Sequence, residues 1–295
     1  MKRIVIFTFA LGVALYTSAQ ISKNEISKNV YLSASNYLAY PSPTSKLTPA
    51  PKGEKPFYIS HYGRHGSRYL IGKHEYEEPV KVMNKADKEG KLTDLGKDVL
   101  HRLKMMSDES DNRLGELTLL GAQQHQGIAK RMYQRFPEVF ADSAEIDARS
   151  TIVIRCILSM ENELQQLISI NPKLKISHDA SVHDMWYLNF DDRKLTKHKM
   201  DSVTKAAYNK FCEAHIHPDR VMKELFNDTA YINNSINKDD LYYKLFSLAS
   251  NLQSSELRHN ITLYDIFNSE EIYDNWQREN VWWYINFGPC PLNGG

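Results

Sequence analysis

The chain has 295 residues, of which 42% are hydrophobic and 25% are charged. That length and composition suffice for one large domain, or for a domain with a sizeable insertion. The 37 basic residues nearly balance the 36 acidic ones. This near-equality of charge argues against a surface that binds nucleic acids or membranes in general. An anionic ligand would need a local cluster of Arg and Lys.

Residues 1–19 have the layout of a secretory signal peptide. Lys2 and Arg3 precede an apolar run from Ile4 to Tyr16, and small residues lead to a cleavage site after Ala19. The apolar run is too short to span a bilayer comfortably, and no cysteine follows the cleavage site to carry a lipid. We therefore predict an exported protein, which is periplasmic, associated with the outer surface or secreted, and has no stable membrane insertion.

Three cysteines, Cys156, Cys212 and Cys290, are an odd number for an exported protein. At most one disulfide can form within the chain, and the spacing does not say between which pair. No pair has the close spacing of a zinc ribbon or a redox motif.

Residues 20–56 are interrupted by five prolines and are predicted to form an N-terminal arm. The first strand signal is Phe57–Tyr62, which is aromatic and β-branched and starts directly after a proline. It leads into Gly63-Arg64-His65-Gly66, where the glycines permit backbone geometry that a strand does not hold. We expect this motif at the carboxyl end of a strand, where open α/β sheets bind ligands.

Helical and strand patterns then alternate. Apolar residues at helical spacing predict helices over Thr93–Met106 and Leu117–Phe136. A strand over Glu145–Arg149, a helix from Ser150 to about Ile170 and a strand over Leu174–Ser177 are expected next. This order predicts an α/β core with a mostly parallel sheet and helical cover, which we assign to residues 57–177.

After that core the pattern is helical and charged, which predicts a helical insertion over residues 178–270. Residues 271–295 are predicted to return toward the α/β core, with a helix over Asp274–Ile285. The aromatic run Trp282-Trp283-Tyr284 indicates packing rather than a platform for sugars or nucleobases. No nucleic-acid partner is expected.

The residues that carry chemistry are in Arg64-His65-Gly66-Ser67-Arg68. Imidazole can attack phosphorus when its other nitrogen is fixed by a hydrogen bond, and guanidinium groups grip phosphate oxygens in pairs. Several cations around one histidine suit a transition state whose charge is spread over three oxygens. Arg155 follows a second predicted strand and brings a third guanidinium to the same sheet edge. The competing interpretation of the five residues is a basic surface turn.

Two further histidine patterns are weaker. His178-Asp179 and His183-Asp184 are the only His-Asp pairs, and we interpret them as ordinary polar loops. As metal sites, His178 with His183 or His215 with His217 lack clustered cysteines and a clear third ligand. No metal and no cofactor is therefore predicted.

Three motifs together resemble the histidine acid phosphatases. They are Arg-His-Gly-x-Arg, Leu-Thr-x-x-Gly-x-x-Gln and Arg-Ser-Thr-x-x-x-Arg-Cys-x-x-Ser, in this order between Phe57 and Leu167. Within that family the chain is most similar to the multiple inositol polyphosphate phosphatases, including bacterial exported members. The resemblance implies a three-layer α/β fold of the phosphoglycerate-mutase-like kind with a helical insertion, and a metal-independent phosphomonoesterase acting on inositol polyphosphates such as phytate.

The resemblance also implies roles for single residues. His65 would be the catalytic nucleophile that becomes phosphohistidine, and Arg64, Arg68 and Arg155 would clamp the phosphate. Ser67, at the variable position of the motif, would shape the substrate pocket. The partner implied is a small-molecule phosphomonoester.

Two departures from the family pattern affect this interpretation. Leu70 stands where the family usually has a proline. The family's downstream histidine, followed by the acid that protonates the leaving group, has no counterpart before Gly295, where family members continue for another strand, motif and helix. We therefore expect the last strand region and the proton donor to be missing. The alternatives are a catalytically impaired phosphate-binding protein and an incomplete fragment.

Overall fold

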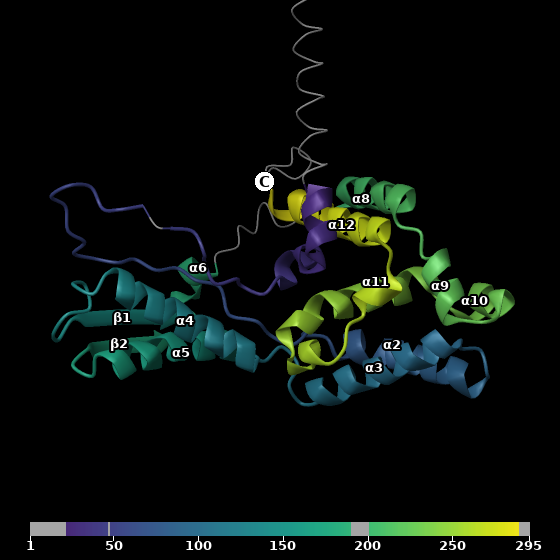
Figure 1. The fold of residues 1–295 in the computed structure, drawn as a ribbon, viewed down its shortest axis with the longest axis horizontal. Helices are drawn as coiled ribbons and strands as arrows, with labels where there is room; N and C mark the ends of the chain where they lie inside the picture. The colour runs from purple at the N-terminus through teal and green to yellow at the C-terminus, as the bar shows by residue number, and fades with distance from the viewer. Residues whose placement is uncertain (1–21, 47, 190–200, 289–295) are drawn as a thin grey trace, which may run out of the picture.

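The structure is a computed structural model that describes residues 22–46, 48–189 and 201–288. Residues 1–19 and Cys290 lie outside this range, so the signal-peptide prediction and any disulfide of Cys290 are not addressed; Cys156 and Cys212 are free. The described chain is mainly helical and has two lobes (Figure 1). One lobe holds the strands with α4 and α5, and the other holds α2, α3 and α9–α11.

The first lobe is built around a parallel pair of strands, β1 (Glu145–Ser150) and β2 (Lys175–Ala180), joined by α5 (Ile154–Ile170). α4 (Leu119–Arg135) packs against α5. A short helix, α6 (Met185–Leu188), follows β2. The small apolar core of this lobe has Ala129, Phe140, Leu167 and Leu174 at its centre, with Ile146 of β1 and Ile176 of β2 packed against it.

The second lobe is helical and contains the larger core. Its elements include η1 (Val30–Tyr37), α2 (Lys73–Lys88), α3 (Asp94–Ser110), α8 (Ser202–His215), α9 (Asp219–Leu225), α10 (Thr229–Ser235), α11 (Lys238–Asn251), η3 (Leu252–Ser254), η4 (Glu256–His259), η5 (Tyr264–Ile266) and α12 (Ser269–Phe287). Met83 of α2, Leu103 of α3 and Leu245 of α11 are fully buried together. The predicted core over residues 57–177 grouped α2 and α3 with the sheet, whereas their buried side chains pack with α9 and α11.

Most of the predicted elements are confirmed. α3, α4, both strands and α12 lie where the periodicity places them, and Thr118 caps α4 by accepting a hydrogen bond from the backbone N–H of Gly121. The start of α5 is later than predicted. Ser150 is the last residue of β1, its hydroxyl donates to the Thr151 carbonyl rather than capping a helix, and α5 begins at Ile154.

The predicted strand Phe57–Tyr62 is wrong. These residues form neither strand nor helix, and Phe57, Tyr58 and Tyr62 are exposed, Phe57 by 93%. Aromatic and β-branched residues favour extended backbone, but a strand also needs a neighbour that accepts its ladder of hydrogen bonds. In the described chain β1 pairs with β2 alone. The three layers implied by the resemblance stay a prediction.

Candidate functional site

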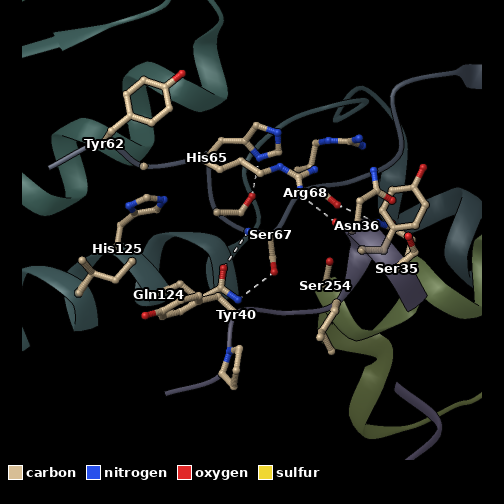
Figure 2. Close-up of a pocket in the computed structure, with 18 of the residues that line it drawn as sticks. Ser35, Asn36, Tyr40, Tyr62, His65, Ser67, Arg68, Gln124, His125 and Ser254 are labelled. Carbon is tan, nitrogen blue, oxygen red and sulfur yellow. Dashed lines mark hydrogen bonds between the residues drawn. The ribbon is translucent and has the colours of Figure 1, made fainter. Parts of the chain in front are cut away.

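A cavity of about 540 Å³ lies where the two lobes meet (Figure 2). Its walls come from the segment 61–68, from η1 and the residues just after it, from α4, and from the end of α11 with η3. Arg64, His65, Ser67 and Arg68, four of the five predicted site residues, line it. The motif that the sequence singled out therefore faces a space large enough for a small ligand.

The loop that carries the motif is anchored by α4 and α5. The backbone N–H of Gly66 donates to Ser159 Oγ at 3.1 Å. The N–H of Ser67 donates to Gln124 Oε1 at 2.8 Å, and Gln124 Nε2 donates back to Ser67 Oγ at 3.0 Å, as the dashed lines in Figure 2 show. The Ser67 carbonyl accepts from the N–H of Thr118 at 2.9 Å. Ser67 thus attaches the loop to the start of α4. This contact is how Ser67 would shape the pocket, as predicted.

Two glycines let the loop approach α4 this closely. A Cβ on Gly66 would come within 2.5 Å of the Gly121 carbonyl oxygen, and a Cβ on Gly121 would meet the Ser67 backbone, with the Ser67 nitrogen 2.9 Å away. Backbone atoms on both sides leave no flexible group to move aside. The glycine of the second motif is therefore explained by contact between backbones.

We expect Gly121→Ala to push the loop that carries His65 off α4. A misplacement of about 1 Å at a reacting group can cost on the order of 10²-fold in rate. Gly127→Ala on the same helix is the matched control, because its Cβ would meet only the flexible end of Arg131. Phosphate release should fall about 10²-fold in Gly121→Ala and be retained in Gly127→Ala; equal rates would contradict the packing argument.

The His65 side chain has its tautomer set by its own loop. Nδ1 lies 2.8 Å from the Gly66 carbonyl oxygen, which only accepts, so Nδ1 carries the hydrogen and donates. In neutral imidazole the lone pair is then on Nε2. Burial is the main cause that lowers the pKa of His65 to about 4; the Gly66 hydrogen bond opposes the shift, and the charges of Arg64, Arg155 and Arg68 contribute to it. His65 is therefore a neutral imidazole at neutral pH.

The pH profile of kcat/KM should show this depressed pKa. If His65 is the attacking group, only its neutral form has a lone pair on Nε2, so activity at acidic pH should persist to about pH 4 and fall as the pH drops through that value. An ordinary histidine would lose its lone pair near pH 6.5. Steady-state rates on p-nitrophenyl phosphate between pH 3 and 8 measure the acidic side of this profile. A loss of activity centred near pH 6.5 would contradict the lowered pKa of His65.

The three predicted arginines have carbonyl oxygens as their hydrogen-bond acceptors. Arg64 Nη1 donates to Asn36 at 2.9 Å, Arg68 Nη1 to Tyr69 at 2.8 Å and Arg155 Nη1 to Gly115 at 3.3 Å. Within the described residues none of the three is paired with a carboxylate. The Nε atoms of Arg68 and Arg155 are buried without a hydrogen-bond partner. Positive charge gathered in this way, with unused donors, suits a multivalent anion.

Arg155 differs from the other two in position. It lies near the start of the helix, as predicted, and is the second residue of α5, but it is not among the residues that line this cavity. Burial and the nearby Arg68 lower the pKa of its guanidinium. Because it also lowers the pKa of His65, its charge acts on the His65 imidazole even without lining the cavity.

A carboxylate held between two histidines was missed by the sequence analysis. Glu163 of α5 lies with Oε1 2.6 Å from His125 Nδ1 and 3.5 Å from His61 Nε2. Its side chain is 12% exposed. Burial alone would raise its pKa, but the hydrogen bonds from His125 and His61 outweigh this and lower it. The only signal was spacing, since Glu163 is two helical turns beyond Arg155 on the face that also carries Ser159.

The other histidine pairs stay apart from the cavity. His178 lies on β2 with Nδ1 2.6 Å from Glu161 Oε1, and Asp184 lies near Arg149. Over the ranges that the structure covers, no group of three or more His, Cys, Asp or Glu side chains is arranged to hold a metal ion. In the same ranges no helix has the length and apolar character needed to cross a membrane.

Comparison with known proteins gives similarity in structure alone. No family model matches the chain, and no curated protein sequence matches it. Three solved structures of the multiple inositol polyphosphate phosphatase of Bifidobacterium longum are similar in fold. The complex with inositol hexasulfate has a TM-score of 0.67 and 16% identity over 85% of this chain and 69% of that one.

The other two structures of that enzyme agree with the first. The complex with phosphate has a TM-score of 0.59 and 17% identity, covering 81% of this chain and 65% of that one. The apo form has a TM-score of 0.56 and 15% identity, covering 83% and 67%. The fold similarity to multiple inositol polyphosphate phosphatases that the three motifs predicted is confirmed.

Proposed function

We propose that this chain hydrolyses phosphomonoesters through a phosphohistidine at His65 and acts on inositol polyphosphates such as phytate. The observation that carries the proposal is a neutral imidazole, with its lone pair on Nε2, beside three guanidinium groups that no carboxylate neutralises within the described chain. The fold similarity to an enzyme solved with inositol hexasulfate and with phosphate supports the substrate class.

In this proposal the arginines supply the positive charge that the transferring phosphoryl group needs, so no metal ion is required. Arg64 and Arg68 contact the phosphoryl oxygens, and Arg155 adds positive charge near His65. Nε2 of His65 attacks phosphorus, the ester oxygen leaves, and water then releases phosphate from the histidine. Purified chain should release phosphate from phytate in the presence of EDTA; a strict need for added metal would count against this mechanism.

Phosphate binding without turnover is the second candidate. It is favoured by one observation: none of the described residues that line the cavity is Asp or Glu. General acid catalysis typically contributes ~10²–10⁴-fold, so a site without a proton donor would turn over only esters with good leaving groups. Phosphate at 100 times its Kd would stabilise the fold by about 2.7 kcal/mol in either case, so binding alone does not separate the two candidates. Rates of hydrolysis of an alkyl phosphate separate them, because only a site with a proton donor hydrolyses such an ester rapidly.

We also propose that the chain is exported, on the strength of the layout of residues 1–19. Expression in a host with a secretory pathway should yield a protein whose first residue is Gln20. A product that stays in the cytoplasm and keeps Met1 would overturn this.

A further inference from the structure

The segment from Phe57 to Gly63 leads into the loop that carries His65, but its backbone gives it no support. It forms neither helix nor strand, and none of its backbone N–H or C=O groups is hydrogen-bonded to another described residue. Holding such a segment in one conformation costs conformational entropy, which other contacts must offset. Its place beside the first lobe is therefore set by its side chains.

Side chains attach this segment to the rest of the described chain in three ways. Ile59 packs against the small apolar core of the first lobe, a contact without directional preference. The Tyr62 hydroxyl donates to the Leu188 carbonyl at 2.9 Å, on the exposed side. The His61 ring makes an ionic contact, because its Nε2 lies 3.5 Å from Glu163 Oε1 of α5. Of the three contacts, this last one ends on a charged group between the helices.

Glu163 is fixed in place by both helices of the lobe. It belongs to α5, and its Oε1 also lies 2.6 Å from Nδ1 of His125, a buried residue of α4. Beside this pair, Gln126 Nε2 donates to Asn162 Oδ1 at 2.9 Å, again from α4 to α5. An ionised carboxylate only accepts, so His125 Nδ1 and His61 Nε2 both face it as N–H groups. The carboxylate is therefore a firm attachment point for the His61 ring.

Helix α5 holds the chain on both sides of His65. After His65, the N–H of Gly66 donates to Ser159 Oγ at 3.1 Å. Before His65, the His61 ring contacts Glu163, which is four residues beyond Ser159. Residues four apart lie on the same face of a helix, so one face of α5 carries both attachment points. The short stretch between these two points includes His65, and both contacts limit its freedom.

Charge strengthens the contact between Glu163 and His61. The hydrogen bond to Glu163 raises the pKa of His61, although burial of the ring opposes this. When the ring is protonated, it forms an ion pair with the carboxylate, and hydrogen bonds between charged groups are stronger than those between neutral ones.

We propose that Glu163 is a positioning residue for the reaction at His65 and that it acts through His61; this rests on the proposed function. The Glu163 carboxylate holds His61, and with it the stretch that ends at His65, against α5. Attack on phosphorus needs a well-placed nucleophile, and a misplacement of about 1 Å can cost on the order of 10²-fold in rate. Loss of the contact should therefore slow the attack without removing a group that reacts.

The test measures, by rapid quench, the maximal rate at which p-nitrophenyl phosphate phosphorylates His65, and the substrate concentration that gives half that rate. This substrate has a leaving group that needs no proton, so the rate reports on attack alone. His61→Ala and Glu163→Ala should each lower the maximal rate on the order of 10²-fold. The half-saturating concentration should change little, because Arg68 and Arg155 lie outside the stretch that moves.

Two further variants serve as a partial rescue and a control. Glu163→Gln keeps an oxygen that accepts from both rings, so it should recover part of the loss seen in Glu163→Ala. His101→Ala removes an exposed histidine on α3 and should match the wild type.

The double variant separates positioning from general support of the fold. If Glu163 acts through His61, Glu163→Ala should cost nothing more once residue 61 is alanine, so the two losses should not add. If Glu163 only joins α4 to α5 through His125, its removal should cost the same with or without His61. His61→Ala leaves the pair of Glu163 and His125 intact, so this variant tests the contact even where Glu163→Ala fails to fold.

Three results would overturn the assignment. They are a wild-type rate in His61→Ala, losses that add in the double variant, and a raised half-saturating concentration with the maximal rate retained. Wild-type chain that is not phosphorylated on His65 would remove the proposed function itself. That result differs from an active wild type with an indifferent His61→Ala variant.

Discussion

Replacing His65 with alanine should abolish phosphate release from both phytate and p-nitrophenyl phosphate. Loss of the nucleophile in a hydrolase that forms a covalent intermediate costs on the order of 10⁶-fold in kcat. In the proposed mechanism the leaving group does not matter here, because His65→Ala removes the group that attacks phosphorus.

Phosphate binding and folding are the controls for that variant. The His65 ring is partly buried, and among the described residues it hydrogen-bonds to the carbonyl of the next residue in its own loop. The arginines and the bonds from Ser67 to Gln124 remain, so His65→Ala should keep its melting temperature and still be stabilised by phosphate. Release of phosphate at more than a trace of the wild-type rate would show that another residue is the nucleophile.

Arg68→Ala should lose about 10²–10³-fold in kcat/KM, the usual effect of removing one donor from a charged transition state. Arg68 lines the cavity with a buried, unpartnered Nε and packs over the Tyr37 ring at 5.6 Å. Arg68→Lys should recover only part of the loss, because an ammonium group cannot bind two oxygens side by side.

Two measurements make the Arg68 prediction specific. Stabilisation of the fold by inorganic phosphate should shrink in Arg68→Ala along with the rate, since the same guanidinium serves both. Arg135→Ala, an exposed arginine on α4, should change neither. Full activity of Arg68→Lys would indicate that a single positive charge suffices at this position, and that two parallel hydrogen bonds to phosphate oxygens are not needed.

The helices and the two strands could be predicted because their signals are local. Leu95, Val99, Leu100 and Leu103 repeat at helical spacing, and Thr118 and Asn171 stand at helix ends where capping groups belong. Phe57–Tyr62 has an equally clear local pattern, but its outcome depends on a partner far away in sequence. Extended backbone is a local property and a strand is not, which is why this prediction failed.

The same difference between local and long-range contacts explains which site residues could be predicted from the sequence. Arg64 to Arg68 are neighbours in sequence, so one motif placed them together, and Arg155 followed from its place at the start of a helix. Glu163, His125 and His61 come from two helices and a loop, and only the packing of α4 against α5 brings them together. No spacing within one element predicts a contact made across three.

The most direct measurement is the site of phosphorylation. The full chain is mixed with p-nitrophenyl phosphate and quenched in alkali, which preserves phosphohistidine, and its peptides are then analysed by mass spectrometry. The proposed mechanism predicts that phosphate is found on His65, that acid removes it, and that His65→Ala carries none. Phosphate on a different residue, or rapid turnover with no labelled histidine, would contradict it.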